Sequence, residues 1–135
     1  MLQIADFIAA RYRKVAEIGI GENTAVAEAL KRRGVKVIAT DIKNVKSPVE
    51  FYIDDILNPR IEIYIGVELI YSIRPPLELF NAIRRLAEKL NADCLIKPLY
   101  GDYCDGRIVN YKGASFYFWK NRKEHGSETV SNEKI

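Results

Sequence analysis

Short runs rich in β-branched residues alternate with helical patterns along most of the chain, and this alternation is the feature that most restricts its fold. Strands are predicted, in chain order, at residues 14–19, 35–40, 50–53, 67–72 and 93–97. Helices are predicted at residues 2–12, 23–33 and 75–90, with a short helical stretch at 59–65. Such alternation is typical of an α/β domain, in which helices flank a mainly parallel sheet.

The pattern changes after the fifth predicted strand. Residues 107–111 and 115–119 are two strand-like runs on either side of the turn signal Lys112-Gly113, which predicts a β-hairpin. The expected fold is therefore an α/β, mainly parallel sheet flanked by helices, with a C-terminal antiparallel β-hairpin. Residues 1–123 are predicted to form one domain, and residues 124–135 a polar, disordered tail.

Composition excludes several classes of protein. A chain of 135 residues with 48% hydrophobic and 29% charged residues can bury the core of a single domain without disulfide bonds or structural metal ions. The net charge of +3 does not by itself indicate a polyanionic partner. No run approaches the roughly 20 apolar residues of a membrane span, and the start lacks a signal-peptide pattern. We therefore expect a cytoplasmic protein with no membrane association.

Few residues are suited to metal binding or nucleophilic catalysis. The chain has two cysteines, Cys94 and Cys104, and one histidine, His125, which lies in the polar tail. Neither Cys-x-x-Cys nor His-Glu-x-x-His occurs, so we expect no zinc site, and the thiols are interpreted as core and loop residues. Asp54 and Asp55 are adjacent at a strand end, where their side chains point in different directions, and no metal is expected there.

The segment Glu17-Ile-Gly-Ile-Gly-Glu-Asn23, between a predicted strand and a helix, carries the strongest functional signal. Gly19 and Gly21 allow a sharp turn and a close approach of the backbone to a ligand. The following helix, which Asn23 can cap, offers unpaired amides at its start. Asp41 ends the second strand, 22 positions after Gly19 (41 minus 19), where an acidic side chain can accept both ribose hydroxyls. These residues predict a nucleoside site.

The charges at this site favour one class of nucleoside. Glu17 and Glu22 flank the glycines, and Thr24 replaces the third glycine of the dinucleotide pattern. Carboxylates oppose a pyrophosphate but attract a cation. S-adenosylmethionine carries a sulfonium and an ammonium at that end, so the charges favour it over an NAD-type dinucleotide, which remains the alternative.

These motifs resemble those of class I S-adenosylmethionine-dependent methyltransferases. The resemblance rests on Glu17-x-Gly19-x-Gly21, on Asp41 after the second strand and on Asp54-Asp55-Ile56 after the third. The order of elements, including the terminal hairpin, is similar to this Rossmann-like, methyltransferase-type fold over about residues 1–120. More narrowly, the chain is similar to a small uncharacterised archaeal family with a reduced version of the fold.

The resemblance implies positions for the cofactor. Glu17, Gly19 and Gly21 would border the methionine moiety, with Asn23 in place of the third glycine of the methyltransferase pattern. Asp41 would hold the ribose, and Asp55 with Ile56 would meet the adenine. The full predicted set of cofactor-binding residues is Glu17, Gly19, Gly21, Asn23, Asp41, Ile42, Asp54, Asp55, Ile56 and Ser72.

The segment after the fourth strand departs from the family. Many amino-group methyltransferases carry Asn or Asp followed by Pro-Pro-aromatic, whereas this chain has Ser72-Ile-Arg-Pro-Pro-Leu77. Arg74 could hold an anionic substrate, or it could be a solvated residue before a helix that starts at Pro75. A helix that is usual after the fifth strand is missing. No catalytic base is named, and both an enzyme and a non-catalytic nucleoside-binding or partner module are retained as hypotheses.

The C-terminal hairpin offers a second class of partner. Residues 107–125 carry a net charge of +4 (5 minus 1), interleaved with Tyr111 and the aromatic run 116–119. Basic groups with stackable rings suit single-stranded RNA. In the alternative interpretation, the rings pack on the core and the lysines protect an edge strand from aggregation. The predicted partners are thus an adenosyl small molecule and, through the hairpin, RNA.

Overall fold

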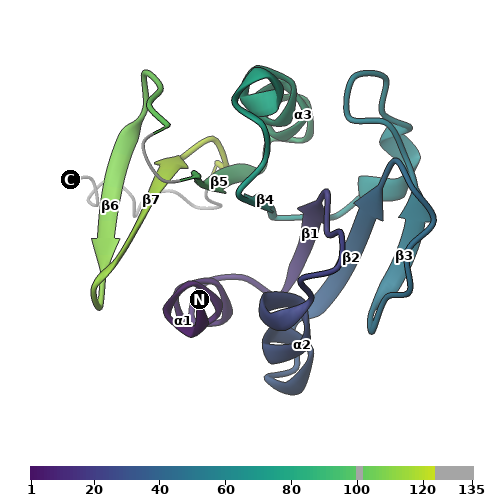
Figure 1. Ribbon diagram of the computed structural model, residues 1–135, viewed down its shortest axis with the longest axis horizontal. Helices are drawn as coiled ribbons and strands as arrows, with labels where there is room; N and C mark the ends of the chain where they lie inside the picture. The colour runs from purple at the N-terminus through teal and green to yellow at the C-terminus, as the bar shows by residue number, and fades with distance from the viewer. Residues whose placement is uncertain (100–101, 124–135) are drawn as a thin grey trace.

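The computed structural model describes residues 1–99 and 102–123 of the chain (Figure 1). The strands of this part are β1 (Lys14–Ile18), β2 (Lys36–Asp41), β3 (Glu50–Ile53), β4 (Leu69–Ile73), β5 (Asp93–Lys97), β6 (Arg107–Tyr111) and β7 (Ala114–Trp119). They form one sheet in the order β3-β2-β1-β4-β5-β7-β6. The first five strands run parallel to their neighbours, and β7 pairs antiparallel with both β5 and β6. The predicted fold class is confirmed.

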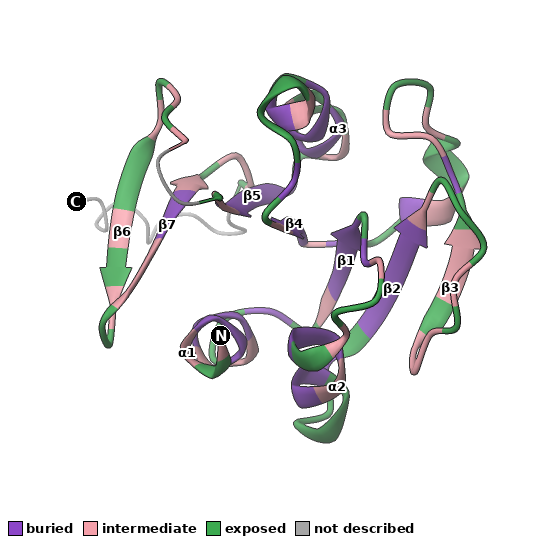
Figure 2. Cartoon of the chain, in the orientation of Figure 1, coloured by how far each residue is buried: buried purple, intermediate pink, exposed green. Residues whose placement is uncertain are grey.

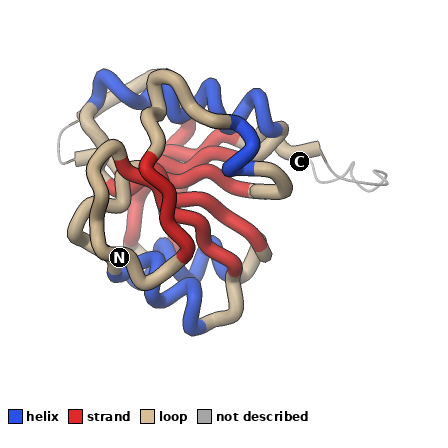
Figure 3. The backbone as a smooth tube through the Cα atoms, turned by 90° about the vertical axis from the view of Figure 1, so that its right-hand side faces the viewer, coloured by secondary structure: helices blue, strands red, loops and turns tan. Residues whose placement is uncertain are grey.

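Helices cover both faces of the sheet, which makes three layers (Figures 1 and 3). One face carries α1 (Leu2–Ala9) and α2 (Ala25–Arg32), and the other carries α3 (Phe80–Leu90). Two short 3-10 helices, η1 (Ile61–Tyr64) and η2 (Leu77–Leu79), lie in the connections before and after β4.

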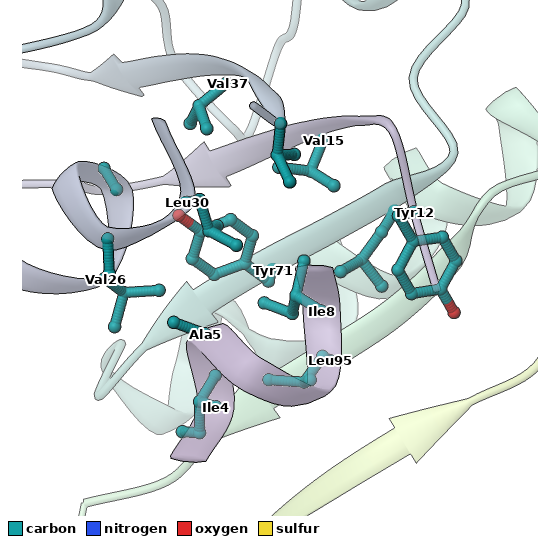
Figure 4. Packing of buried hydrophobic residues seen from close by; sticks show 14 of the residues in the cluster. Ile4, Ala5, Ile8, Tyr12, Val15, Val26, Leu30, Val37, Tyr71 and Leu95 are labelled. Carbon is teal, nitrogen blue, oxygen red and sulfur yellow. The ribbon is translucent and has the colours of Figure 1, made fainter. Parts of the chain in front are cut away.

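The two faces hold two separate parts of the core. Under α1 and α2, apolar side chains of both helices meet those of the central strands, as Figure 4 shows for Ile8, Val15, Leu30, Tyr71 and Leu95. On the other face, the apolar stripe of α3 packs on β4 and β5. The predicted stripe is confirmed: its members Phe80, Ile83, Leu86 and Ala87 are buried, and Leu90 is half-buried. Burial is greatest in the central strands and least in the edge strands β3 and β6 (Figure 2).

The strand order reverses between β1 and β4. From β1 the chain crosses over α2 to β2 on one side, and from β4 it crosses over α3 to β5 on the other. In open α/β sheets, ligands bind at the carboxyl ends of the strands beside such a reversal. The loops that follow β1, β2, β3 and β4 are therefore the place to look for a site.

Some predicted boundaries are wrong. The opening helix ends at Ala9 rather than Tyr12, and Pro75 and Pro76 do not start the third helix. The backbone of Pro76 is extended, with φ −56° and ψ 142°, so that η2 comes first and α3 begins only at Phe80. No helix lies between β5 and β6 in the described residues 98, 99 and 102–106. The predicted disordered tail, 124–135, lies outside the described residues.

A buried carboxylate joins two distant segments of the chain at the amino-terminal edge of the sheet. Asp93 is the first residue of β5, and the Tyr12 hydroxyl donates a hydrogen bond to its Oδ2 at 2.5 Å. The backbone amides of Asn121 and Arg122 donate to its Oδ1 at 2.9 and 2.7 Å. Asp93 thus joins the segment before β1 to the segment after β7. Among the described residues, no helix combines the length and hydropathy needed to cross a bilayer.

Candidate functional site

The loop after β1 is bound closely to the end of β2. The amides of Gly19 and Ile20 both donate to the Thr40 carbonyl oxygen, at 2.9 and 3.1 Å. Gly19 and Gly21 have φ of 71° and 55°, in the left-handed region that side chains disfavour. A Cβ on Gly19 would meet no atom within 4 Å, so glycine is needed there for its backbone conformation rather than for space.

Asp41 lies at the glycine loop. Its Oδ2 accepts a hydrogen bond from the Gly21 amide at 2.9 Å, and its Oδ1 accepts one from the Lys43 amide at 3.0 Å. Because an ionised carboxylate offers about four acceptor positions, about two remain for a ligand. The side chain is half-buried, so its position is fixed while part of it stays open to solvent.

The start of α2 differs from the prediction. Thr24, not Asn23, occupies the N-cap position, and its hydroxyl is hydrogen-bonded to the Glu28 carboxylate. Asn23 is exposed, and its Oδ1 accepts from the Ala25 amide at 3.3 Å. Asn23 therefore caps the first helical amide from the residue before the N-cap.

Glu17 faces the interior rather than the rim of the site. Only 1% of its surface is exposed, and the hydroxyl of buried Tyr71 donates to its Oε1 at 2.8 Å. Burial raises the pKa of Glu17 to about 8, so the carboxyl group is mainly protonated at neutral pH. The prediction that Glu17 and Glu22 both present charge at the rim is wrong for Glu17; Glu22 is exposed.

Ser72 joins the two strands at the reversal. Its hydroxyl donates to the Ile18 carbonyl oxygen at 2.7 Å, one position beyond the last paired residues of β1 and β4. The side chain is buried, so this hydroxyl holds the strand ends together.

Asp54 is committed to contacts within the protein. Its Oδ2 accepts from the Tyr64 hydroxyl at 2.6 Å, and its Oδ1 accepts from the amide and Nε of Arg60 at 3.1 and 3.3 Å. Burial and the neighbouring Asp54 carboxylate raise the pKa of Tyr64. The Asp54 amide donates to the Asp41 carbonyl oxygen at 3.0 Å, so this cluster supports the end of β2 from behind.

Asp55 and three apolar residues complete the edge beyond β2 and β3. Asp55 is half-buried, and its Oδ1 accepts from the Leu57 amide at 2.9 Å, which closes a turn. Ile56 is half-buried against the α3 side of the core. Ile42 and Leu57 are each 66% exposed, which is unusual for large apolar side chains and suits a planar, uncharged ligand surface.

Hydrogen bonds connect some of the ten predicted cofactor residues to one another or to a neighbouring strand. Direct hydrogen bonds join Gly21 to Asp41 and Asp41 to Asp54, and Ser72 is bonded to the strand that precedes Gly19. Sequence reasoning missed Tyr64, Arg60 and Tyr71. The β4 pattern placed Tyr71 next to Ser72 on a buried strand, but no signal in the sequence identified Tyr64 or Arg60 as partners of Asp54.

The cysteines do not supply an activated nucleophile. Cys94 is buried and free, and burial raises the pKa of its thiol to about 12. Burial also raises the pKa of Cys104 above its usual range. His125, the other half of a conceivable pair, lies outside the described residues. Within residues 1–99 and 102–123, no cluster of three or more His, Cys, Asp or Glu residues could hold a metal ion.

The hairpin aromatics pack inward. Phe116 and Tyr117 are buried. The rings of Tyr111 and Phe118 contact Phe7 edge to face, with centroid distances of 5.3 and 5.6 Å, and Trp119 stacks on Tyr117 at 6.0 Å. Rings held in this way are not a free platform for bases, which agrees with the core-packing alternative.

Several of the hairpin cations are paired. Lys112 contacts Asp6 at 2.8 Å, Arg122 contacts Glu68 at 3.2 Å and Lys120 contacts Asp93 at 3.6 Å. Together with the buried rings, these ion pairs leave RNA binding by the hairpin without structural support.

Solved structures with the same architecture define the class of the fold. A putative methylase of Haemophilus influenzae is similar over 90% of this chain and 89% of its own, with 8% identity and a TM-score of 0.55. An S-adenosyl-L-methionine methyl transferase of Silicibacter pomeroyi covers 88% of both chains, with 16% identity and a TM-score of 0.53. CalS10 of Micromonospora echinaspora, an amino pentose methyltransferase solved with bound SAM, covers 84% of this chain and 58% of its own, with 11% identity and a TM-score of 0.52. The chain has a Rossmann-like, methyltransferase-type fold.

The sequence places the chain in a family. The family UPF0146, described as an uncharacterised protein family, matches residues 1–121, and the chain belongs to it. A UPF0146 protein of Archaeoglobus fulgidus is 61% identical over 120 residues, which is 87% of this chain and 92% of the relative. One from Pyrococcus abyssi is 38% identical over 130 residues, covering 89% and 99%. The predicted resemblance to a small archaeal family is confirmed.

Proposed function

We propose that the protein binds S-adenosylmethionine at the carboxyl ends of β1, β2 and β3, as a methyltransferase-like protein. The observation that carries this proposal is the hydrogen bond from the Gly21 amide to Asp41, which holds an acidic side chain beside the glycine loop with acceptor positions to spare. Ribose hydroxyls are donors that such a carboxylate accepts.

The remaining parts of the ligand have matching surfaces. The exposed side chain of Ile42, with Ile56 and the turn at Asp55, would meet the adenine. The methionine end would lie along Gly19 and Gly21, where Glu22 supplies a surface carboxylate for its positive charge. Two structural neighbours support this choice of ligand, since their structures contain SAM and S-adenosylhomocysteine.

An NAD-type dinucleotide is the competing ligand. The buried, protonated Glu17 does not oppose a pyrophosphate, so the charge argument against NAD rests on Glu22. Glu22 and the absence of the third glycine keep S-adenosylmethionine ahead.

Calorimetry with S-adenosylmethionine, S-adenosylhomocysteine and NADH tests the ligand directly. We expect the adenosyl ligands to bind. Asp41→Ala should lower their affinity by about 10- to 100-fold, because a hydrogen bond to a charged group contributes about 1.5–3 kcal/mol. Glu88→Gln, an exposed acid in the last turn of α3, is the matched control and should leave affinity unchanged. Binding of NADH alone, or equal affinity in Asp41→Ala, would refute the proposal.

Catalysis is a separate question. Methyl transfer is an in-line displacement in which positioning matters most, so the lack of a named base does not decide it. Incubation with radiolabelled S-adenosylmethionine and total RNA or protein extract distinguishes an enzyme from a module that binds the ligand without transferring its methyl group. Transfer of the label to RNA would support RNA as a partner. The cytoplasmic location stays a prediction from the sequence.

A further inference from the structure

Arg74 has an unusual backbone conformation directly after β4. Among the described residues, three that are not glycine have a positive φ: Arg74 at 55°, Asn91 at 58° and Lys112 at 50°. Asn91 is the C-cap of α3, and Lys112 begins the tight turn of the hairpin, two positions where the left-handed conformation is common. Arg74 has neither reason. It also precedes Pro75, and residues before proline favour extended backbone.

The surrounding structure holds this strained residue in place. The Arg74 amide donates to the Lys97 carbonyl oxygen at 2.6 Å, at the last pair of β4 and β5, Ile73 with Lys97. On the other side, Pro75 is buried. Strain of this kind persists only where neighbours enforce it, and it clusters at binding and catalytic sites. Arg74 stands beside the reversal of strand order, next to the proposed cofactor.

The side chain of Arg74 is free to bind a ligand. It is exposed, and among residues 1–99 and 102–123 no carboxylate lies within ion-pair distance of it, whereas Arg33 and Arg60 contact Asp6 and Asp54 at 2.8 and 3.3 Å. Guanidinium groups bind carboxylates and phosphates through two parallel hydrogen bonds.

Apolar surface accompanies this cation. Leu77 follows Arg74 by three residues, and Leu99 follows Lys97, the residue to which the Arg74 amide is bonded. Both leucine side chains are 44% exposed. Exposed apolar groups on the segments that follow β4 and β5, together with a cation at the end of β4, match a ligand that has an anionic group and an apolar body.

We infer that the carboxyl end of β4 binds a small organic anion, with its carboxylate or phosphate on Arg74 and its apolar body on Leu77 and Leu99. This inference rests on the proposed function, since it assigns the class of the second ligand beside the adenosyl group. It also accounts for the lack of the carbonyl and the aromatic ring with which amino-group methyltransferases hold an amine.

The test is a titration of the protein, with and without S-adenosylhomocysteine, followed by NMR of the amides of Arg74, Leu77 and Leu99. The probes are benzoate, phenyl phosphate and neutral benzamide. We expect saturable shifts with benzoate and phenyl phosphate and none with benzamide. The anion that saturates the shifts at the lower concentration is the preferred one. Arg74→Gln should weaken binding of the anions at least tenfold and Arg74→Lys less, whereas Arg85→Gln, an exposed arginine on α3, should not change it. Equal binding by Arg74→Gln, or no saturable shift, would overturn the inference.

A second variant tests the strain. Glycine adopts φ near 55° without a steric penalty, but it also adds conformational freedom to the unfolded chain, so Arg74→Gly should leave Tm within a few degrees of wild type while it abolishes anion binding. A fall in Tm well beyond this range would show that the Arg74 side chain is packed against the fold rather than available to a ligand, and would contradict the inference. The outcome is separable from the proposed function: S-adenosylhomocysteine binding without anion binding refutes only this inference, and failure of S-adenosylhomocysteine to bind refutes the proposed function.

Discussion

The two sides of the strand reversal use their polar residues in different ways. On the β1-β2-β3 side, the carboxylates of Asp41, Asp54 and Asp55 each accept at least one backbone amide, so the loops there are held in place by their own side chains. On the β4-β5 side, Arg74 is exposed, its backbone is strained, and no helix follows β5 in the described residues. The first side is organised by hydrogen bonds within the chain. The second side leaves the Arg74 guanidinium exposed, as the proposed anion site requires.

Two buried contacts hold these sides together. Tyr71 donates to Glu17, and Ser72 donates to the Ile18 carbonyl, so both hydrogen bonds run from β4 to β1. Variants at these buried contacts should change the stability of the fold most, variants in the loops less, and variants at the surface least.

The largest effect is expected at Glu17. Between its ordinary pKa of 4.5 and the raised pKa of about 8, the folded chain holds a proton that the unfolded chain has released. The free energy of unfolding should therefore fall as pH rises through this window, by roughly 3–5 kcal/mol in all. Glu17→Gln has no proton to lose and should flatten this part of the curve.

Urea denaturation at several pH values between 4.5 and 8.5 measures the effect as the difference between the two proteins. Glu88→Gln is the control and should follow the wild-type curve. Parallel curves for wild type and Glu17→Gln would show that Glu17 is ionised in the fold.

Asp54→Ala should have the next largest effect. It leaves the buried hydroxyl of Tyr64 without its carboxylate and frees Arg60, which should cost about 2–4 kcal/mol of stability. Asp55→Ala loses one backbone contact at a half-buried turn and should cost less than about 1 kcal/mol. Equal costs in urea denaturation would mean that the Asp54 cluster does not support the end of β2.

Ser72→Ala should cost about 1 kcal/mol, because it removes one buried hydrogen bond between β4 and β1. Ser115→Ala in the hairpin, where the hydroxyl makes no hydrogen bond within the described part of the chain, is the control and should change stability little. If both variants lose the same stability, the Ser72 hydroxyl does not join the strands.

The smallest effect is expected at Glu22. Glu22→Gln should weaken the binding of S-adenosylmethionine about 1.4- to fivefold relative to the binding of S-adenosylhomocysteine, because an exposed charge contributes about 0.2–1 kcal/mol and only S-adenosylmethionine carries the sulfonium. Calorimetry at low and high salt measures the loss of S-adenosylmethionine affinity caused by Glu22→Gln, divided by the loss of S-adenosylhomocysteine affinity. This ratio should approach 1 in high salt. A ratio of 1 at low salt as well would remove the charge argument for S-adenosylmethionine.

The sequence predicted the parts of this site that depend on spacing. A strand, a glycine turn and an acid at the end of the next strand are enough to expect Asp41 beside Gly21, since parallel neighbours bring their carboxyl ends together. The sequence did not predict the burial of Glu17. Glu17 lies two residues after Val15 on the same strand, so the two side chains point to the same face, where Val15 is part of the core.

Other features could not be predicted because they depend on loop conformation. The contact of Asp54 with Tyr64 requires the path of the chain through η1, and the strain at Arg74 requires the bond from its amide to Lys97. In the same way, Pro75 and Pro76 are typical of a helix start, but the extended backbone at Pro76 delays α3 by a turn.

Asp93 binds the segment before β1 and the segment after β7, and this has a practical consequence. Tyr12, Asn121 and Arg122 meet at the amino-terminal edge of the sheet, on the side opposite the glycine loop. A fluorophore, an affinity handle or a fused domain attached directly after residue 123 would therefore be joined near the amino-terminal edge of the sheet. Immobilised in this way, the protein would present the edge that carries the glycine loop and Asp41 to solution.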